Sequence, residues 1–132
     1  MRAAGVILAL AGLSGAAGMV LAALTAHPAS TGGPLPEAGR LVDAALRYHL
    51  LHAAALVALA AAAAATGGRW PWAVALCWIG GTLMFSGGLY LRAFADIASL
   101  GPIVPIGGAL YILGWVLLAV VGGLAAIRAG RR

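Results

Sequence analysis

Charge is scarce in this sequence, and one kind of basic residue is missing altogether. The 132 residues include eight arginines, two aspartates and one glutamate but no lysine, so that charged residues make up only 8% of the chain. A water-soluble domain carries about 25% charged residues, and this composition therefore excludes an ordinary soluble fold. The arginines flank apolar runs and form no patch with polar and aromatic side chains, so the net charge of +5 does not indicate nucleic-acid binding.

Cysteine and catalytic motifs are equally scarce. Cys77 is the single cysteine, so the chain has no internal disulfide, and inside an apolar run this residue behaves as a small apolar side chain. There is no Gly-x-Ser-x-Gly elbow and no glycine-rich phosphate loop, and neither Ser14 nor Ser86 has a base beside it in the sequence. The sequence therefore predicts no catalytic residue and favours a non-enzymatic protein.

Long apolar runs are the main feature that the sequence does have. Charge-free stretches of 24, 21, 22 and 31 residues cover positions 3–26, 48–68, 70–91 and 97–127. Each reaches the roughly 20 residues that a helix needs to cross a bilayer, and the first exceeds the roughly 7 to 15 apolar residues of a cleaved signal peptide. The sequence predicts an all-α integral membrane protein, a bundle of four transmembrane helices in a single domain over residues 1–132. The expected helices span about 3–26, 37–66, 71–94 and 105–128.

The positions of the arginines predict how the chain is oriented in the membrane. Four spans place both termini and the turn at Arg69 on one side, with five arginines there against three on the other side, at positions 40, 47 and 92. Because arginine is enriched on the cytoplasmic side, we expect both termini in the cytoplasm. The segment from Arg40 to Arg47 is amphipathic and is expected in the headgroup zone, with Asp43 and Arg47 spaced for an ion pair.

Small residues predict where the helices pack. Lipid provides no hydrophobic drive for helix association, so helices adhere where small side chains allow close backbone approach. Two glycine pairs in the third span lie seven positions apart, and two glycines in the fourth span have the same spacing. Further small residues in the first and fourth spans favour self-association or docking into a larger membrane complex. The glycines expected at helix contacts are Gly80, Gly81, Gly87, Gly88, Gly107 and Gly114.

Polar residues gather near one predicted boundary of the membrane, the outer one. They either cap helix ends and bond one another there, or form the polar end of a pocket for a quinone, a lipid or another apolar ligand. The second hypothesis expects side chains from different helices to lie within reach of one another or of one shared ligand at the outer leaflet. The residues assigned to that ligand site are His27, Tyr48, His52, Ser86 and Tyr90.

A metal site is the alternative interpretation of the same region. Three imidazoles with an open coordination position suit zinc or copper, and His27, His49 and His52 are the three histidines of the chain. A histidine pair spaced i,i+3 is a weak signal, however, no carboxylate accompanies it at ligand spacing, and nothing places two of these ligands on opposed helices for haem. The sequence implies no particular cofactor, and a metal-binding or small-solute transport function stays as the rival.

Four motifs, taken in order, resemble a known family. Leu24-Thr-Ala-His27 ends the first span, and Arg47-Tyr48 with His52-Ala53 opens the second. The third span holds Leu83-Met-Phe-Ser86-Gly87-Gly-Leu-Tyr90, and the fourth holds Pro105-Ile-Gly107-Gly108 and then Gly114-Trp115. This set is similar to the small YgdD/YwdK family, a domain of unknown function numbered 423 that resembles the animal transmembrane protein 256 group. The resemblance implies a four-helix protein of the bacterial inner membrane and implies no established activity. The loop after His27 departs from the family pattern, being richer in Ser, Thr, Gly and Pro.

Overall fold

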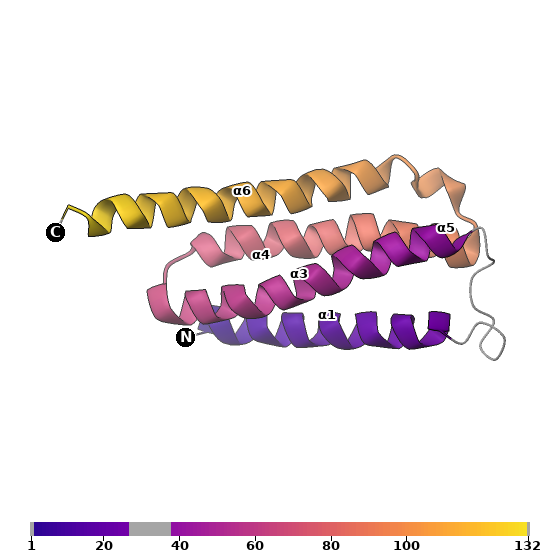
Figure 1. Cartoon of the computed structure of the whole chain (residues 1–132), viewed down its shortest axis with the longest axis horizontal. Coiled ribbons are helices and arrows are strands. Elements are labelled where there is room, and N and C mark those ends of the chain that lie inside the picture. Colours follow the sequence, from indigo (N-terminus) through magenta and orange to yellow (C-terminus); the bar gives the residue numbers. More distant parts are fainter. Residues whose placement is uncertain (1, 27–37, 132) are drawn as a thin grey trace.

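The structure, a computed structural model, describes residues 2–26 and 38–131, which form four long helical spans (Figure 1). All four are long and apolar enough to cross a membrane. The prediction of an all-α, four-helix membrane bundle is confirmed, and the helix ends differ from the expected ones by no more than two residues. The spans are α1 (Arg2–Ala26), α3 (Gly39–Thr66), a third span made of α4 (Trp70–Gly81), a π-helical turn (Thr82–Ser86) and α5 (Gly87–Ala95), and α6 (Ile103–Ala129).

Glycine and proline explain the tight turn between α3 and α4. Gly67 and Gly68 have φ values of 67° and 83°, a left-handed conformation that residues with a side chain rarely adopt. The Gly67 N–H donates to the carbonyl of Ala63 at 3.0 Å and so caps α3. Pro71 follows in the first turn of α4, where an N–H would have no partner within the helix.

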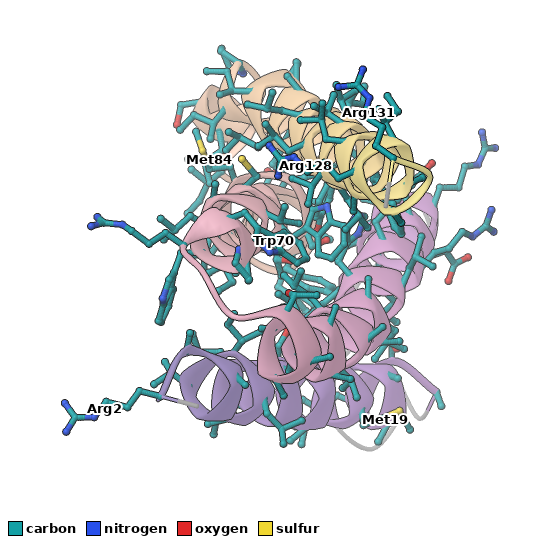
Figure 2. The ribbon with its side chains drawn as sticks, turned by 90° about the vertical axis from the view of Figure 1, so that its left-hand side faces the viewer. Arg2, Met19, Trp70, Met84, Arg128 and Arg131 are labelled. Atoms are coloured by element: carbon teal, nitrogen blue, oxygen red, sulfur yellow. The ribbon has the colours of Figure 1, made fainter. Side chains whose placement is uncertain are left out.

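The helices are arranged around a central pair, α3 and α4. α1 packs mainly against α3, whereas α6 packs against α4 and the π-helical turn, so α1 and α6 lie on opposite sides of the central pair (Figures 1 and 2). Both ends of the chain lie at the same end of the bundle (Figure 1), and Figure 2 looks onto this end, with Arg2, Arg128 and Arg131 labelled. We call it the terminal end, and the opposite end, which holds Gly39, Ala95 and Ile103, the loop end.

Two glycines of α6 set its distance from the third span. A Cβ at Gly107 would meet the backbone of Met84 and Phe85 in the π-helical turn, and a Cβ at Gly114 would meet the indole of Trp78. A main-chain neighbour cannot move aside as a flexible side chain can, so α6 lies against the backbone of the turn itself. This turn, in which the Gly87 N–H donates to the carbonyl of Thr82, was not predicted from the sequence. π-Helical turns are rare in proteins, and those that occur often lie at functional sites.

Candidate functional site

His49 lies at the centre of a polar contact among three helices. Its imidazole on α3 is buried, with 6% of the residue exposed. The Nε2 atom lies 3.0 Å from the Ser14 hydroxyl of α1, and the Nδ1 atom lies 3.3 Å from the Tyr90 hydroxyl of α5. His49 therefore links α1 to the third span, although these two elements make few direct contacts.

The hydrogen-bond donors in this contact are not all used within it. A neutral imidazole has one N–H and one lone-pair nitrogen, so His49 donates one of the two bonds and accepts the other. If Nε2 donates to Ser14, then Tyr90 donates to Nδ1 and the Ser14 proton is left over. In the other tautomer the proton left over belongs to Tyr90. Within the described residues neither hydroxyl has a further partner, so one hydroxyl always remains able to donate to a third group.

A cavity of about 350 Å³ lies beside this contact. Its walls are mainly leucine, isoleucine and alanine side chains of α1 and the third span, and its polar lining residues are Ser14, His49, Thr82 and Tyr90. Leu13 and Leu83 also line it and are each 70% exposed, so the cavity opens sideways, toward the lipid. A mostly apolar cavity of roughly 300 to 1,000 Å³ with a few convergent polar groups is typical of small-molecule sites.

The cavity reaches deeper into the bundle than the sequence suggested. Ser14 is the midpoint of α1, and Thr82 lies at the middle of the third span, whereas Tyr90 is only five residues from the loop end of that span. The polar groups therefore extend from the loop end to the middle of the apolar helices. The polar side chains are therefore not gathered only at the predicted outer boundary, because Ser14 and Thr82 line the same cavity as Tyr90.

His52 belongs to a second, separate network. Its Nδ1 atom donates to the backbone carbonyl of Tyr48 at 2.8 Å, and the Trp115 indole N–H donates to its Nε2 atom at 3.1 Å. A carbonyl can only accept and an indole N–H can only donate, so the ring is held as the neutral tautomer with its proton on Nδ1. The ring also stacks on Tyr111, with centroids 3.6 Å apart and planes 11° apart. Both nitrogens are engaged, so His52 joins α3 to α6 and has no free lone pair for a ligand.

Ser86 belongs to this second network through Tyr111, and its hydroxyl donors are all used. Ser86, which is fully buried, donates to the carbonyl of Ala45 at 3.0 Å. The Tyr111 hydroxyl donates to Thr82 at 3.1 Å, and the Thr82 hydroxyl donates to the carbonyl of Trp78 at 2.9 Å. Three hydroxyl protons make three bonds, and the Ser86 and Tyr111 oxygens lie 3.3 Å apart. In contrast to the contact at His49, this network leaves no hydroxyl donor free among the described residues, although the buried indole N–H of the neighbouring Trp78 has no partner there.

The structure divides the predicted ligand residues between the two networks. Tyr90 contacts His49, whereas His52 and Ser86 are joined through Tyr111. Tyr48 is 42% exposed and lies edge-on to Phe85, with ring centroids 5.2 Å apart. His27 lies outside the described residues. The expectation of one cluster containing both His52 and Tyr90 is therefore corrected to two, because His49 and His52 face different neighbours of α3.

The metal hypothesis meets the same division. His49 and His52 point into different networks, and both nitrogens of His52 are hydrogen-bonded. Among residues 2–26 and 38–131, no group of three His, Cys, Asp or Glu side chains is placed to hold a metal ion. The third histidine of the predicted set, His27, lies outside these ranges. The described imidazoles therefore do not form a shared metal centre.

Several members of the two polar networks were not predicted from the sequence. Ser14, Thr82, Tyr111 and Trp115 all take part in the two networks, yet none was assigned to a site. Their position inside apolar spans indicated that they take part in such contacts, since a hydroxyl or indole in the membrane needs a hydrogen-bond partner from the protein. Which partner it finds depends on how the helices are rotated against one another.

Four apolar spans, two buried polar networks and a laterally open cavity define a multi-pass α-helical membrane protein. The model of a family described as "Protein of unknown function (DUF423)" matches residues 21–108. The chain belongs to this family, as the four motifs indicated.

The chain is similar to UPF0382 membrane proteins of several bacteria. It is 36% identical over 114 residues to the one from Haemophilus influenzae, which covers 85% of this chain and 89% of that protein. It is 30% identical over 124 residues to the UPF0382 inner membrane protein YgdD of Escherichia coli strain K12, covering 94% and 93%. Identity to a relative from Staphylococcus haemolyticus is 36% over 78 residues, and that match spans 63% of the relative, less than two thirds of its length. No solved structure matches the chain significantly.

Proposed function

We propose that the protein is a non-enzymatic membrane module that binds a largely apolar molecule carrying a hydrogen-bond acceptor, such as a quinone or a lipid carbonyl, in the cavity between α1 and the third span. One observation carries the proposal: the contact of Ser14, His49 and Tyr90 always leaves one hydroxyl donor unused, and both hydroxyl-bearing residues line the cavity. A buried donor without an acceptor costs about 1 to 3 kcal/mol. An acceptor on the ligand removes that cost, and the apolar walls accommodate the rest of the molecule.

The composition of the cavity favours binding over catalysis or coupled transport. Among the described residues, its lining contains no arginine, aspartate or glutamate. Acid-base catalysis needs paired ionisable groups, and ion-coupled transport usually needs one deep in the membrane. The cavity lies around the middle of the bundle and extends toward the loop end as far as Leu21 and Tyr90. We place the loop end on the outer side of the bacterial inner membrane, the membrane stated in the name of YgdD. Because the cavity faces lipid, a side chain of a larger membrane assembly is the other possible occupant.

A cavity-filling substitution tests the site. Gly87 lines the cavity, and among the described residues a Cβ there would meet only the Thr82 carbonyl of its own span, at 3.8 Å. The prediction that Gly87 lies at a contact between helices is therefore wrong, and Gly87→Leu is expected to fill the cavity without disturbing the helix contacts. A short-chain benzoquinone is titrated into the protein purified in mild detergent, and the bound fraction is measured by native mass spectrometry. Gly122→Leu is the matched control, since Gly122 on α6 has open space around it. We expect Gly87→Leu to abolish binding and Gly122→Leu to leave it unchanged.

Hydroxyl deletions test the donor. The double variant Ser14→Ala/Tyr90→Phe removes both hydroxyls and is expected to weaken binding by roughly 2- to 10-fold, the equivalent of one net hydrogen bond of about 0.5 to 1.5 kcal/mol. Each single variant is expected to weaken binding less, because the remaining hydroxyl can still donate to the ligand. Unchanged binding in both Gly87→Leu and the double variant would contradict the proposal. A stoichiometric transition metal that is lost in His49→Ala and His52→Ala would support the alternative metal-dependent function. A second membrane protein that stays bound in the native mass spectrum would favour a role as an accessory subunit.

A further inference from the structure

A charged pocket lies at the start of α3, away from the cavity described above. Arg40, Asp43 and Arg47 line it together with Ala44 and Tyr48, and its volume is about 370 Å³. The two arginines are seven residues apart, which is about two helical turns, so they extend from one face of α3. No ion pair joins Asp43 and Arg47 in the part of the chain that the structure describes. Among residues 2–26 and 38–131, both guanidinium groups therefore keep donors available for another partner.

An apolar groove adjoins this charged pocket and continues toward the middle of the membrane. It has a volume of about 490 Å³ and lies between α3 and α6. Tyr48 lines both the pocket and the groove, and the groove is further lined by Leu51, Phe85, Pro105, Ile112 and Trp115. Along the axis of α3, the surface thus changes from two arginines at the loop end, through one half-exposed tyrosine, to an apolar channel.

This order of charge and apolar surface matches the order of groups in a phospholipid. We propose that the groove binds one anionic phospholipid, with its phosphodiester between Arg40 and Arg47 and one acyl chain along α3 and α6 beyond Tyr48. Guanidinium groups bind phosphate through paired, charge-assisted hydrogen bonds. Two arginines and Asp43 together carry a net charge of +1, which balances the single negative charge of a phosphodiester. The site does not rest on the proposed function, because the groove and the cavity have no lining residue in common.

Removing a positive charge and removing a negative charge from the pocket should change lipid binding in opposite directions, and this gives the sharpest test of the headgroup site. Native mass spectrometry measures the binding of phosphatidylglycerol and of phosphatidylcholine to the full chain in detergent. Each of Arg40→Gln and Arg47→Gln is expected to weaken phosphatidylglycerol binding about fivefold, since a basic residue near an anionic lipid contributes about 1 kcal/mol. Asp43→Asn is expected to strengthen it. Arg128→Gln, an exposed arginine at the terminal end, is the matched control and should change binding less than twofold.

A bulky residue in the groove tests the acyl chain. Ala109 lines the groove and is exposed, so Ala109→Trp fills it from the lipid side. It is expected to weaken phosphatidylglycerol binding, whereas Ala125→Trp, at an exposed position nearer the terminal end of α6, is not. The thermal unfolding midpoint without added lipid shows whether each variant is folded.

Four results would overturn the proposal in a folded protein. These are equal effects of the Arg40, Arg47 and Arg128 substitutions, weaker binding in Asp43→Asn, equal affinity for the two lipids, and normal binding in Ala109→Trp. Competition by free glycerol 3-phosphate as strong as by the lipid would also overturn it, because the pocket would then be a simple anion site. Loss of quinone binding in Gly87→Leu leaves these measurements unaffected, so the two sites fail or succeed separately.

Discussion

At the scale of single residues, two histidines one turn apart on α3 differ in chemistry because their partners differ. His52 is enclosed by a carbonyl acceptor and an indole donor that together fix one tautomer. His49 lies between two hydroxyls, each of which can donate or accept, so its tautomer can adapt to a ligand. His52 therefore joins the helices of the bundle, and His49 is the histidine that lines the proposed ligand cavity.

The bond between Trp115 and His52 can be measured in a double-mutant cycle of Trp115→Phe and His52→Phe. The expected coupling free energy of unfolding is about 0.6 kcal/mol and no more than about 1.7, the range for hydrogen bonds between membrane helices. Unfolding equilibria of the four proteins in bicelles give the value. A coupling free energy of zero would show that the indole and the imidazole are not bonded.

At the scale of elements, the close approach of α6 to the π-helical turn depends on a missing side chain. Gly107 faces the main chain of Met84 and Phe85, and neither can move aside without breaking helical hydrogen bonds. The turn widens the third span at the level where Thr82 and Ser86 supply their hydroxyls to Tyr111. Contact between α6 and the turn thus holds the second polar network together.

Gly107→Ala is therefore expected to lower the free energy of unfolding by roughly 1 to 3 kcal/mol, the usual cost of overpacking. Gly122→Ala on the same helix, where a Cβ meets nothing within 4 Å, is the matched control and should leave stability unchanged or raise it by up to about 1 kcal/mol. Reversible unfolding in mixed micelles provides both values. Equal stability of the two variants would argue against the close contact at Gly107.

At the scale of the whole molecule, the bundle has two chemically different ends. The terminal end holds Arg2, Arg69, Arg128 and Arg131, and the loop end holds Arg40, Arg47 and Arg92. The excess of arginine at the terminal end predicts that this end faces the cytoplasm. Under this orientation the proposed headgroup pocket lies at the outer boundary, and the proposed ligand cavity extends from the middle of the membrane toward it.

Cysteine labelling tests the orientation in a Cys77→Ala background. Ser99→Cys, in the short 3₁₀ turn between α5 and α6, should react with a membrane-impermeant maleimide in intact cells. Gly130→Cys, just after α6, should react only after the cells are permeabilised. The reverse pattern would invert the orientation and place the proposed headgroup pocket at the inner boundary of the membrane.

The spans and the hairpin turn could be predicted from the sequence because they depend on local properties. A helix crosses the bilayer when about 20 consecutive residues are apolar, and neither the partner helix nor its rotation enters that condition. The turn after Thr66 likewise follows from two glycines and a proline in a row, whose backbone preferences act within a few residues.

Only the tertiary structure decided which polar residues meet. In water an apolar stripe shows which face of a helix is buried, but lipid-facing and buried faces of α1 and α6 are both apolar, so periodicity does not reveal their rotation. The separation of His49 from His52, the pairing with Ser14 and Trp115, and the π-helical turn against Gly107 all depend on that rotation. Close packing of small residues and interhelical hydrogen bonds set the rotation, and both act between residues that lie far apart in the chain.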